Sequence, residues 1–559
     1  MKNLINTLKI SLLTMVVLAF VSCSKTKSPY DVIPAGAKIV FVFDGNSLSG
    51  KLGVESFSNT KTYDFIKRSV TEDEKEDFEM YKPIFENSEE SGLDFKKKFF
   101  FFMYKNKTSV DDVFAFYIPV LNKEKFTGMV NKIRKSEKID NQIKTEGDIS
   151  YFMEEDDSPF MAWNDKSLVF LMSKSDMKTV KYLDEAKKLL NNSSGSSIMS
   201  NNDFAKFASR TKDLSLWMDY GMIYDVMPPM QKMMIQTQLP FDMTGTMIHF
   251  YTDFQDGKIV SDYDVVMNDE MKKLMAENKI MKDKFDTGIL SVLSGNPLMN
   301  ISFAFDFRAY YNLMKSMMEQ NQNNFDNFDE QFKAQTGMTV EEALDEFSGE
   351  VSISLHGIDV KDVESIDYLA YYQAGGEGNI DNFKKTVKKP VFYYSAAVKF
   401  NSDKLFNLAL KSLGDDVKEL DNYYSLGTYG YFGYYNGNLL YTNDSVLITD
   451  VAADGKVDDN PLSDTDIADK LNDYPAYVVI NLDWDSYPES LRKFVEDESK
   501  DENEKNTALI NTLKIYKKFE IMPESESKAK MVLWLKDDSR NSLEVIFNSF
   551  DDNIEALAD

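Results

Sequence analysis

The sequence predicts an α+β protein made of two tandem homologous copies, each with mixed or mainly antiparallel sheets covered by helices. Three observations lead to this prediction. Strand and helix patterns alternate along the chain, the strand patterns have a polar side, and the same order of segments occurs twice. A chain of 559 residues that is 43% hydrophobic is long enough to form more than one core.

The strand patterns repeat with a period of two. In 214–218 and in 351–355, leucine, valine, isoleucine or methionine occupies every second position. Such alternation is typical of antiparallel or mixed sheets whose apolar side faces covering helices, which we expect at 123–134 and 403–413. The continuous apolar run Phe99–Met103 differs and predicts a central strand.

Self-similarity predicts that the two copies are 33–290 and 296–559. An apolar run closed by aspartate occurs at 38–44 and 299–306, and again at 214–219 and 477–483. Two further landmarks share an offset of 279 residues (401 − 122 and 443 − 164): Asn122–Phe126 with Asn401–Leu405, and Asn164-Asp165 with Asn443-Asp444. The alternative is coincidence, because Asp and Asn begin helices in any α+β protein.

The N-terminal residues predict a lipoprotein signal peptide over 1–22, followed by a tether over 23–32. Lysines precede an apolar segment, 10–21, that is too short to span a bilayer. The segment then ends at Cys23, the only cysteine, and Phe20–Cys23 is similar to the lipobox of bacterial lipoproteins. We therefore expect Cys23 to carry acyl groups such as palmitate and to anchor the chain to a membrane. The alternative is an ordinary secretory signal that leaves one free thiol.

The composition is acidic. Lysine and arginine number 64 against 92 acidic residues, a net charge of −28, which becomes 62 − 92 = −30 after removal of the signal. This charge disfavours nucleic acid and anionic membrane surfaces as partners of the body as a whole. It suits solubility, although calcium binding is not excluded by charge alone.

No residue pattern assigns a catalytic residue, a metal or a cofactor. The segment Gly45–Gly50 resembles a nucleophile elbow, but its last glycine is displaced by one position, which favours a plain strand-to-helix turn. The two histidines, His249 and His356, both lie in strand patterns and cannot complete a zinc site. The aspartate-rich segment 450–459 lacks the spacing of an EF-hand.

A tyrosine-rich tract at 423–441 is the best candidate for a ligand or partner surface. Its members Tyr429, Tyr431, Tyr434 and Tyr435 are separated by glycines. Tyrosines can stack on a glycan or a partner protein. The alternative is a glycine-turned β-meander that packs on helices.

The chain resembles a group of Bacteroidetes lipoproteins known as domain of unknown function 4836. The resemblance rests on 33–35, 91–94 and 348–351, on the lipoprotein signal and on the chain length. The group has no assigned activity. Acidic residues usually follow the cysteine in surface-displayed lipoproteins of these bacteria, and Ser24–Lys27 contains none. The resemblance therefore implies an outer-membrane protein that faces the periplasm, with the cell surface as the alternative.

The expected function is that of a membrane-anchored lipoprotein with a non-catalytic binding or scaffold role in the cell envelope. Its partner would be an envelope protein or a glycan. The alternative is a glycan-acting hydrolase that uses paired carboxylates, which need only a suitable separation in space.

Overall fold

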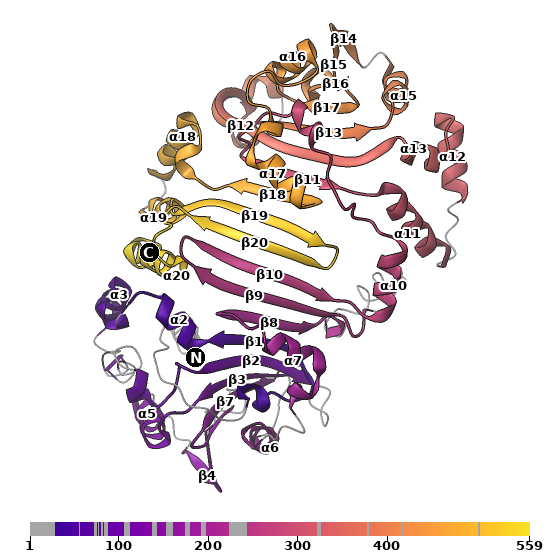
Figure 1. Ribbon diagram of the computed structural model, residues 1–559. Helices are drawn as coiled ribbons and strands as arrows, with labels where there is room; N and C mark the ends of the chain where they lie inside the picture. Colours follow the sequence, from indigo (N-terminus) through magenta and orange to yellow (C-terminus); the bar gives the residue numbers. More distant parts are fainter. Residues whose placement is uncertain are drawn as a thin grey trace. The chain divides into compact units, whose positions relative to one another are not determined.

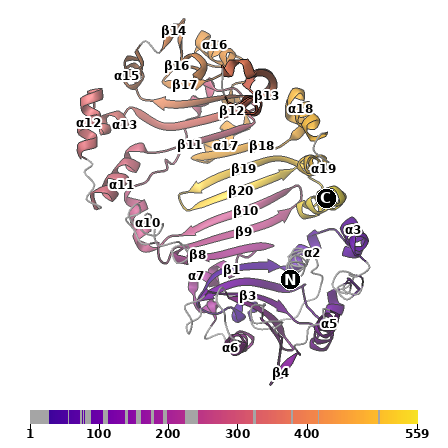
Figure 2. The same cartoon turned by 180° about the vertical axis from the view of Figure 1, so that it is seen from behind.

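The chain forms two compact units. Among the described residues, unit 1 comprises 28–222, 243–269 and 530–558, and unit 2 comprises 270–529. The computed structural model (Figures 1 and 2) describes residues 28–558 except 55, 72–74, 76–77, 80–81, 83–87, 106–111, 137–141, 153–159, 174–178, 192–196, 223–242, 321–325, 377–378, 415–416 and 501–503. The predicted α+β class is confirmed, and the strand pairs with described registers are antiparallel.

In unit 1 the strands pair in the order β4-β5-β6-β7-β3-β2-β1-β8-β9-β10-β20. Their bounds are β1 (Ala37–Asp44), β2 (Lys98–Lys105), β3 (Asp112–Pro119), β4 (Lys144–Glu146), β5 (Ile149–Phe152), β6 (Phe160–Trp163), β7 (Ser167–Ser173), β8 (Leu214–Asp219), β9 (Met247–Gln255), β10 (Lys258–Val266) and β20 (Lys528–Leu535). The predicted central strand at 99–103 is β2, which pairs on both sides.

In unit 2 the order is β14-β15-β16-β17-β13-β12-β11-β18-β19. The bounds are β11 (Met299–Ala304), β12 (Phe347–Ile366), β13 (Lys384–Phe400), β14 (Lys418–Leu420), β15 (Tyr423–Ser425), β16 (Tyr431–Tyr435), β17 (Asn438–Thr442), β18 (Ala476–Asn481) and β19 (Tyr516–Ser525). This is the order of unit 1 with β11 in the place of β1 and β18 in the place of β8.

The helices of unit 1 are α2 (Gly45–Lys51), α3 (Lys61–Ser69), α5 (Lys123–Ser136), α6 (Thr179–Leu190), α7 (Asn202–Ala208), α20 (Ser542–Asp552) and α21 (Ile554–Ala558). Those of unit 2 are α10 (Asp269–Glu277, from Glu270), α11 (Phe307–Gln320), α12 (Asp326–Thr336), α13 (Val340–Leu344), α14 (Tyr368–Gln373), α15 (Lys404–Leu413), α16 (Ser445–Asp454), α17 (Asp466–Asp473), α18 (Glu489–Lys500) and α19 (Glu504–Leu513). Both predicted covering helices are present, as α5 and α15. Among the described residues, no helix combines the length and the apolar composition needed to cross a bilayer.

One of the predicted landmark correspondences is wrong. Asn164 lies in the turn between β6 and β7, where its Oδ1 accepts hydrogen bonds from the backbone of Lys166 and Ser167. Asn443, in contrast, follows β17, and Asp444 caps α16. The other landmark at the same offset is placed consistently, because Asn122 and Asn401 each lie between a strand and a helix, β3 and α5 or β13 and α15.

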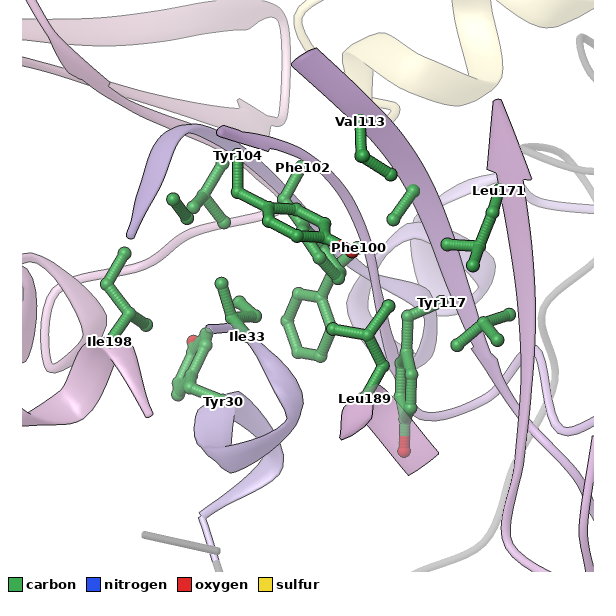
Figure 3. Packing of buried hydrophobic residues seen from close by; sticks show 14 of the residues in the cluster. Tyr30, Ile33, Phe100, Phe102, Tyr104, Val113, Tyr117, Leu171, Leu189 and Ile198 are labelled. Carbon is green, nitrogen blue, oxygen red and sulfur yellow. The ribbon is translucent and has the colours of Figure 1, made fainter. Parts of the chain in front are cut away.

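The core of unit 1 is rich in aromatic residues (Figure 3). Phe100 and Phe102 of β2 are fully buried, and they pack with Tyr30 and Ile33 of the segment that precedes β1. The rings of Tyr30 and Phe100 have centroids 5.3 Å apart. A second cluster of buried residues includes side chains of α5. The sheet of unit 1 therefore has a hydrophobic cluster on each of its two faces.

The alternation predicted for 351–355 is present, but the buried face is the polar one. Ser352 and Ser354 are fully buried, whereas Ile353 is 39% exposed. The serines hydrogen-bond to Asn300 of β11, whose Nδ2 donates to their hydroxyls at 3.0 and 2.8 Å. In 214–218 the buried residues are likewise Ser215 and Trp217. Small side chains can therefore be buried on the covered face of a strand when they are hydrogen-bonded. A prediction from apolar residues alone assigns the wrong face as buried.

The last segment of each predicted copy packs in the other unit. After α10, the backbone N–H of Lys282 donates to Ala304 of β11 at 3.1 Å, within unit 2. At the C-terminus, Asp551 of α20 accepts hydrogen bonds from the backbone N–H groups of Lys61 and Thr62 at 3.0 and 2.6 Å, within unit 1. The compact units therefore differ from the segments 33–290 and 296–559, whose common ancestry stays a prediction.

Candidate functional site

An apolar hollow of about 230 Å³ lies in unit 2 between α15 and the strands of the tyrosine-rich tract. It is lined by Phe400, Leu405, Phe406, Ala409, Leu413, Leu426, Phe432, Leu439 and Tyr441. Each of these side chains is aliphatic or aromatic, so the hollow suits an apolar group rather than a charged one.

The strand register and the helix spacing create this hollow. Phe432 pairs with Tyr441 across β16 and β17, which places both side chains on one face of the meander. On α15, Leu405, Ala409 and Leu413 recur at intervals of four residues and form one helix face.

Phe406 of α15 joins the helix to the meander. Its ring stacks on Tyr434 at 5.4 Å and meets Tyr424 and Phe432 edge-on at 5.8 and 6.0 Å. The contact holds this part of α15 against the strands while no residue of the helix is fully buried.

The corresponding interface of unit 1 is filled. Phe126 of α5 meets Trp163 edge-on at 5.2 Å, and these residues are only 2% and 0% exposed. In unit 2 the contact between α15 and its strands is made by Phe406 and Tyr434. The same helix-on-sheet arrangement is thus sealed in unit 1 and hollow in unit 2.

The four tyrosines singled out by the sequence do not form one surface. Tyr429 is 76% exposed in a short 3₁₀ segment. Tyr434 faces α15, while Tyr431 and Tyr435 project from the opposite face of β16. Tyr435 is buried, its hydroxyl donates to the carbonyl of Asn422 at 3.0 Å, and burial raises its pKa to about 12. Tyr434 contacts the hollow's lining with its ring, through Phe406 and Phe400, and Tyr429 contacts it through its carbonyl, which accepts from the Tyr441 hydroxyl. The 405–413 helix pattern was the signal that could have revealed the site.

His356 lies between a serine and an aspartate. Its Nδ1 is 3.4 Å from Ser395 Oγ, and its Nε2 is 3.2 Å from Asp444 Oδ2. Ser395 is 0% exposed, so its hydroxyl is not placed to attack a substrate in this arrangement. The hydrogen bond from His356 holds the pKa of Asp444 below its usual range against the opposing effect of burial. The three residues link β12, β13 and the start of α16.

His249 has a comparable structural environment in unit 1. Its Nε2 is 2.9 Å from the carboxylate of Asp203, which also accepts from Trp217 Nε1 at 2.8 Å. Burial favours protonation of Asp203, but the hydrogen bonds from His249 and Trp217 lower its pKa overall. In the Gly45–Gly50 segment, Asp44 caps α2 by accepting from the backbone of Ser47, as expected of a plain turn.

The other predicted sites give no geometry for catalysis or metal binding. No cluster of three or more metal-ligating side chains occurs among the described residues. In the 450–459 segment, Asp450 accepts from the backbone of Asp458 at 3.1 Å, and Gly455 ends α16 in a left-handed conformation. Cys23 and the lipobox lie outside the described residues.

Comparison with known proteins identifies the family. A family model described as "Domain of unknown function (DUF4836)" matches residues 30–543. The chain belongs to the DUF4836 family. No curated protein matches it. A solved structure, "Structure of crystal form I of TP0453", is similar at 11% identity over 47% of this chain and 90% of that chain, with a TM-score of 0.23. A score this low carries no argument about the DUF4836 fold.

The cap of α16 gives a test of the His356 link. We expect Asp444→Ala to lower the free energy of unfolding of unit 2 by about 1 to 2 kcal/mol, because α16 loses its cap. The pKa of Asp444 is 3.8 in the unfolded chain and lower in the folded protein. The stabilisation by its carboxylate is therefore complete above about pH 3.8 and is lost as the pH falls through the pKa of the folded state. Urea unfolding at neutral and acidic pH measures both effects.

Asp454→Ala is the matched control, since this exposed aspartate ends the same helix, where a negative charge is unfavourable. Equal losses in both variants, or a loss for Asp444→Ala that persists below the native pKa, would contradict the assignment.

Proposed function

We propose that this protein is a membrane-anchored lipoprotein with a non-catalytic binding role in the cell envelope, and that the hollow beneath α15 binds an apolar group of its ligand or partner. Acylated Cys23 would hold it at the outer membrane, facing the periplasm. The observation that carries the binding role is the contrast between the hollow interface of unit 2 and the sealed interface of unit 1.

The size and chemistry of the hollow support this role. An apolar cavity of roughly 150 Å³ stays dry and binds benzene in another protein. A volume of about 230 Å³ therefore admits a somewhat larger ring or the end of an acyl chain. Removal of such a group from water would favour binding without any polar contact.

The proposal includes an internal duplication. The two units share one order of strand pairing, from β4 to β9 and from β14 to β19. The short segments before β1 and β11 also make equivalent bridges, Pro34 with Ser197 and Ser294 with Pro461. The offsets of these bridges, 294 − 34 = 260 and 461 − 197 = 264, are close to those of the aspartate landmarks. Two copies of one ancestor explain how one interface could keep the structural role while the other opened for binding.

The carboxyl groups do not favour the alternative of a glycan hydrolase. Eight carboxyl groups of the described chain have a shifted pKa of known direction: Asp203, Asp253, Asp286, Glu346, Asp367, Asp444, Glu489 and Asp537. In each the pKa is lowered, because hydrogen bonds stabilise the charged form, against burial that opposes the shift. A glycosidase acid needs a raised pKa.

Filling the hollow tests the binding role. We expect the mature protein to enhance the fluorescence of N-phenyl-1-naphthylamine, and Ala409→Phe to weaken this binding at least about tenfold, equivalent to about 1.4 kcal/mol. Ala409 is exposed at the lining, so a phenyl ring there occupies the space with little cost to the core. Fluorescence titration measures the affinity.

Ala453→Phe supplies the control, because Ala453 is exposed on α16 and does not line the hollow. The binding role is wrong if Ala409→Phe binds the probe as the parent does, or if both substitutions weaken binding equally.

The anchor is tested at Cys23. We expect the parent chain to incorporate labelled palmitate and to sediment with membranes, and Cys23→Ser to do neither, because serine cannot form the thioether that carries the lipid. Ser22→Ala, which keeps a small residue before the cysteine, should behave as the parent. Labelling of Cys23→Ser would exclude this anchor.

Orientation is tested in the same cells. A periplasm-facing protein should survive protease added to intact cells and be digested once the outer membrane is permeabilised. Digestion in intact cells would instead assign the protein to the cell surface.

A further inference from the structure

The β12–β13 hairpin of unit 2 extends well past the strands that flank it. Its register runs from Phe347 opposite Phe400 to Ile366 opposite Lys384, whereas β11 pairs with β12 only as far as Leu355. The far end is closed by α14, and the backbone N–H of Asp367 donates to Phe383 at 2.8 Å. Figure 1 shows these two strands as long neighbouring ribbons.

One face of this extension concentrates positive charge. Lys361 and Lys389 are direct cross-strand partners, and Lys385 lies on the same face four residues from Lys389. Like charges directly opposite each other destabilise a strand pair. Such a pair in so acidic a chain indicates a surface adapted to a negatively charged partner.

The acidic residues of the hairpin leave this face basic. Asp362 and Glu364 occupy alternate positions of β12 and therefore project from the opposite face. On the lysine face, Asp367 forms an ion pair with Lys385 at 2.9 Å, and Asp359 lies at the inner end. Lys361 and Lys389 contact neutral groups, the Tyr393 ring at 5.1 Å and the Ser365 hydroxyl at 3.1 Å.

Large apolar side chains are exposed at the end of the same hairpin. On α14, Tyr368, Leu369 and Tyr372 are 56%, 70% and 68% exposed. Tyrosine is enriched where a protein meets the interface between lipid and water, because its ring is apolar and its hydroxyl is polar.

We propose that Lys361, Lys385 and Lys389 with Tyr368, Leu369 and Tyr372, the lysine–tyrosine tip, bind the surface of an anionic phospholipid bilayer. The lysines would lie against the phosphate groups while the α14 side chains enter the interfacial layer. Acidic residues elsewhere in the chain, more than about 10 Å from the membrane, are screened at 0.1 M salt. On the lysine face itself, the three lysines outnumber Asp359 and Asp367. The site is independent of the acyl anchor, so either can fail alone.

Vesicle flotation tests the tip. The full mature chain carrying Cys23→Ser removes any contribution of the anchor. We expect it to float with vesicles of phosphatidylglycerol and phosphatidylcholine, and not with vesicles of phosphatidylcholine alone. The double variant Lys361→Gln/Lys389→Gln should bind the anionic vesicles roughly 30-fold more weakly, from about 1 kcal/mol for each lysine near the surface.

The stability of the double variant separates binding from folding. Because the substitution removes a repulsive pair, its urea midpoint should equal or exceed that of the parent, which excludes misfolding as the cause of weaker binding. Leu369→Ser should also weaken binding, with less dependence on salt.

The matched control is Lys411→Gln/Lys456→Gln, two exposed lysines of unit 2 outside the hairpin, which should bind as the parent does. Failure of the parent to float with anionic vesicles overturns the proposal. Equal binding to both kinds of vesicle, or equal weakening by the control pair, also overturns it.

Discussion

Each unit depends on the pairing of its first long strand with two strands that lie far away in the chain. β1 hydrogen-bonds to β2 on one side and to β8 on the other, so Phe41 lies between Phe101 and Leu216. β11 is paired in the same way by β12 and β18. Burying a strand requires that both rows of its backbone groups find partners. These pairs between distant strands fix the positions of the helices that cover the sheets.

A second constraint is that polar groups inside the sheets must be satisfied. Ser302 and Ser352 in unit 2 are fully buried, with their hydroxyls 2.7 Å apart. The side chain of Asn300 accepts a hydrogen bond from Ser302 and donates one to Ser352. An unsatisfied buried polar group costs about 1 to 3 kcal/mol, so the members of such a network must be kept together. The His356 link obeys the same rule. A serine beside a histidine and an aspartate is here a way of joining elements, because the serine is inaccessible.

The two units have one helix-on-sheet arrangement with two different interfaces, one filled and one with the hollow for which we propose a binding role. Trp163 and Phe126 fill the space between α5 and its strands, which contributes to the core of unit 1. In unit 2, Tyr434 and Phe406 hold α15 on its strands, and the hollow lies beside them. Both units share one order of strand pairing, so the difference between the two interfaces is local. The hollow and the lysine–tyrosine tip both lie in unit 2, which concentrates the proposed recognition surfaces there.

The sequence by itself determined the fold class, the helices α5 and α15, the central strand β2 and membership of the DUF4836 family, since periodicity and local motifs are properties of neighbouring residues. It did not reveal which face of 351–355 is buried, because serines with partners pack as well as apolar residues do. Only the tertiary structure showed that Tyr431 and Tyr434 face opposite ways and that Asn164 and Asn443 are not equivalent. It alone placed Lys361 opposite Lys389. These features depend on strand register and on contacts between distant segments, which no local pattern encodes.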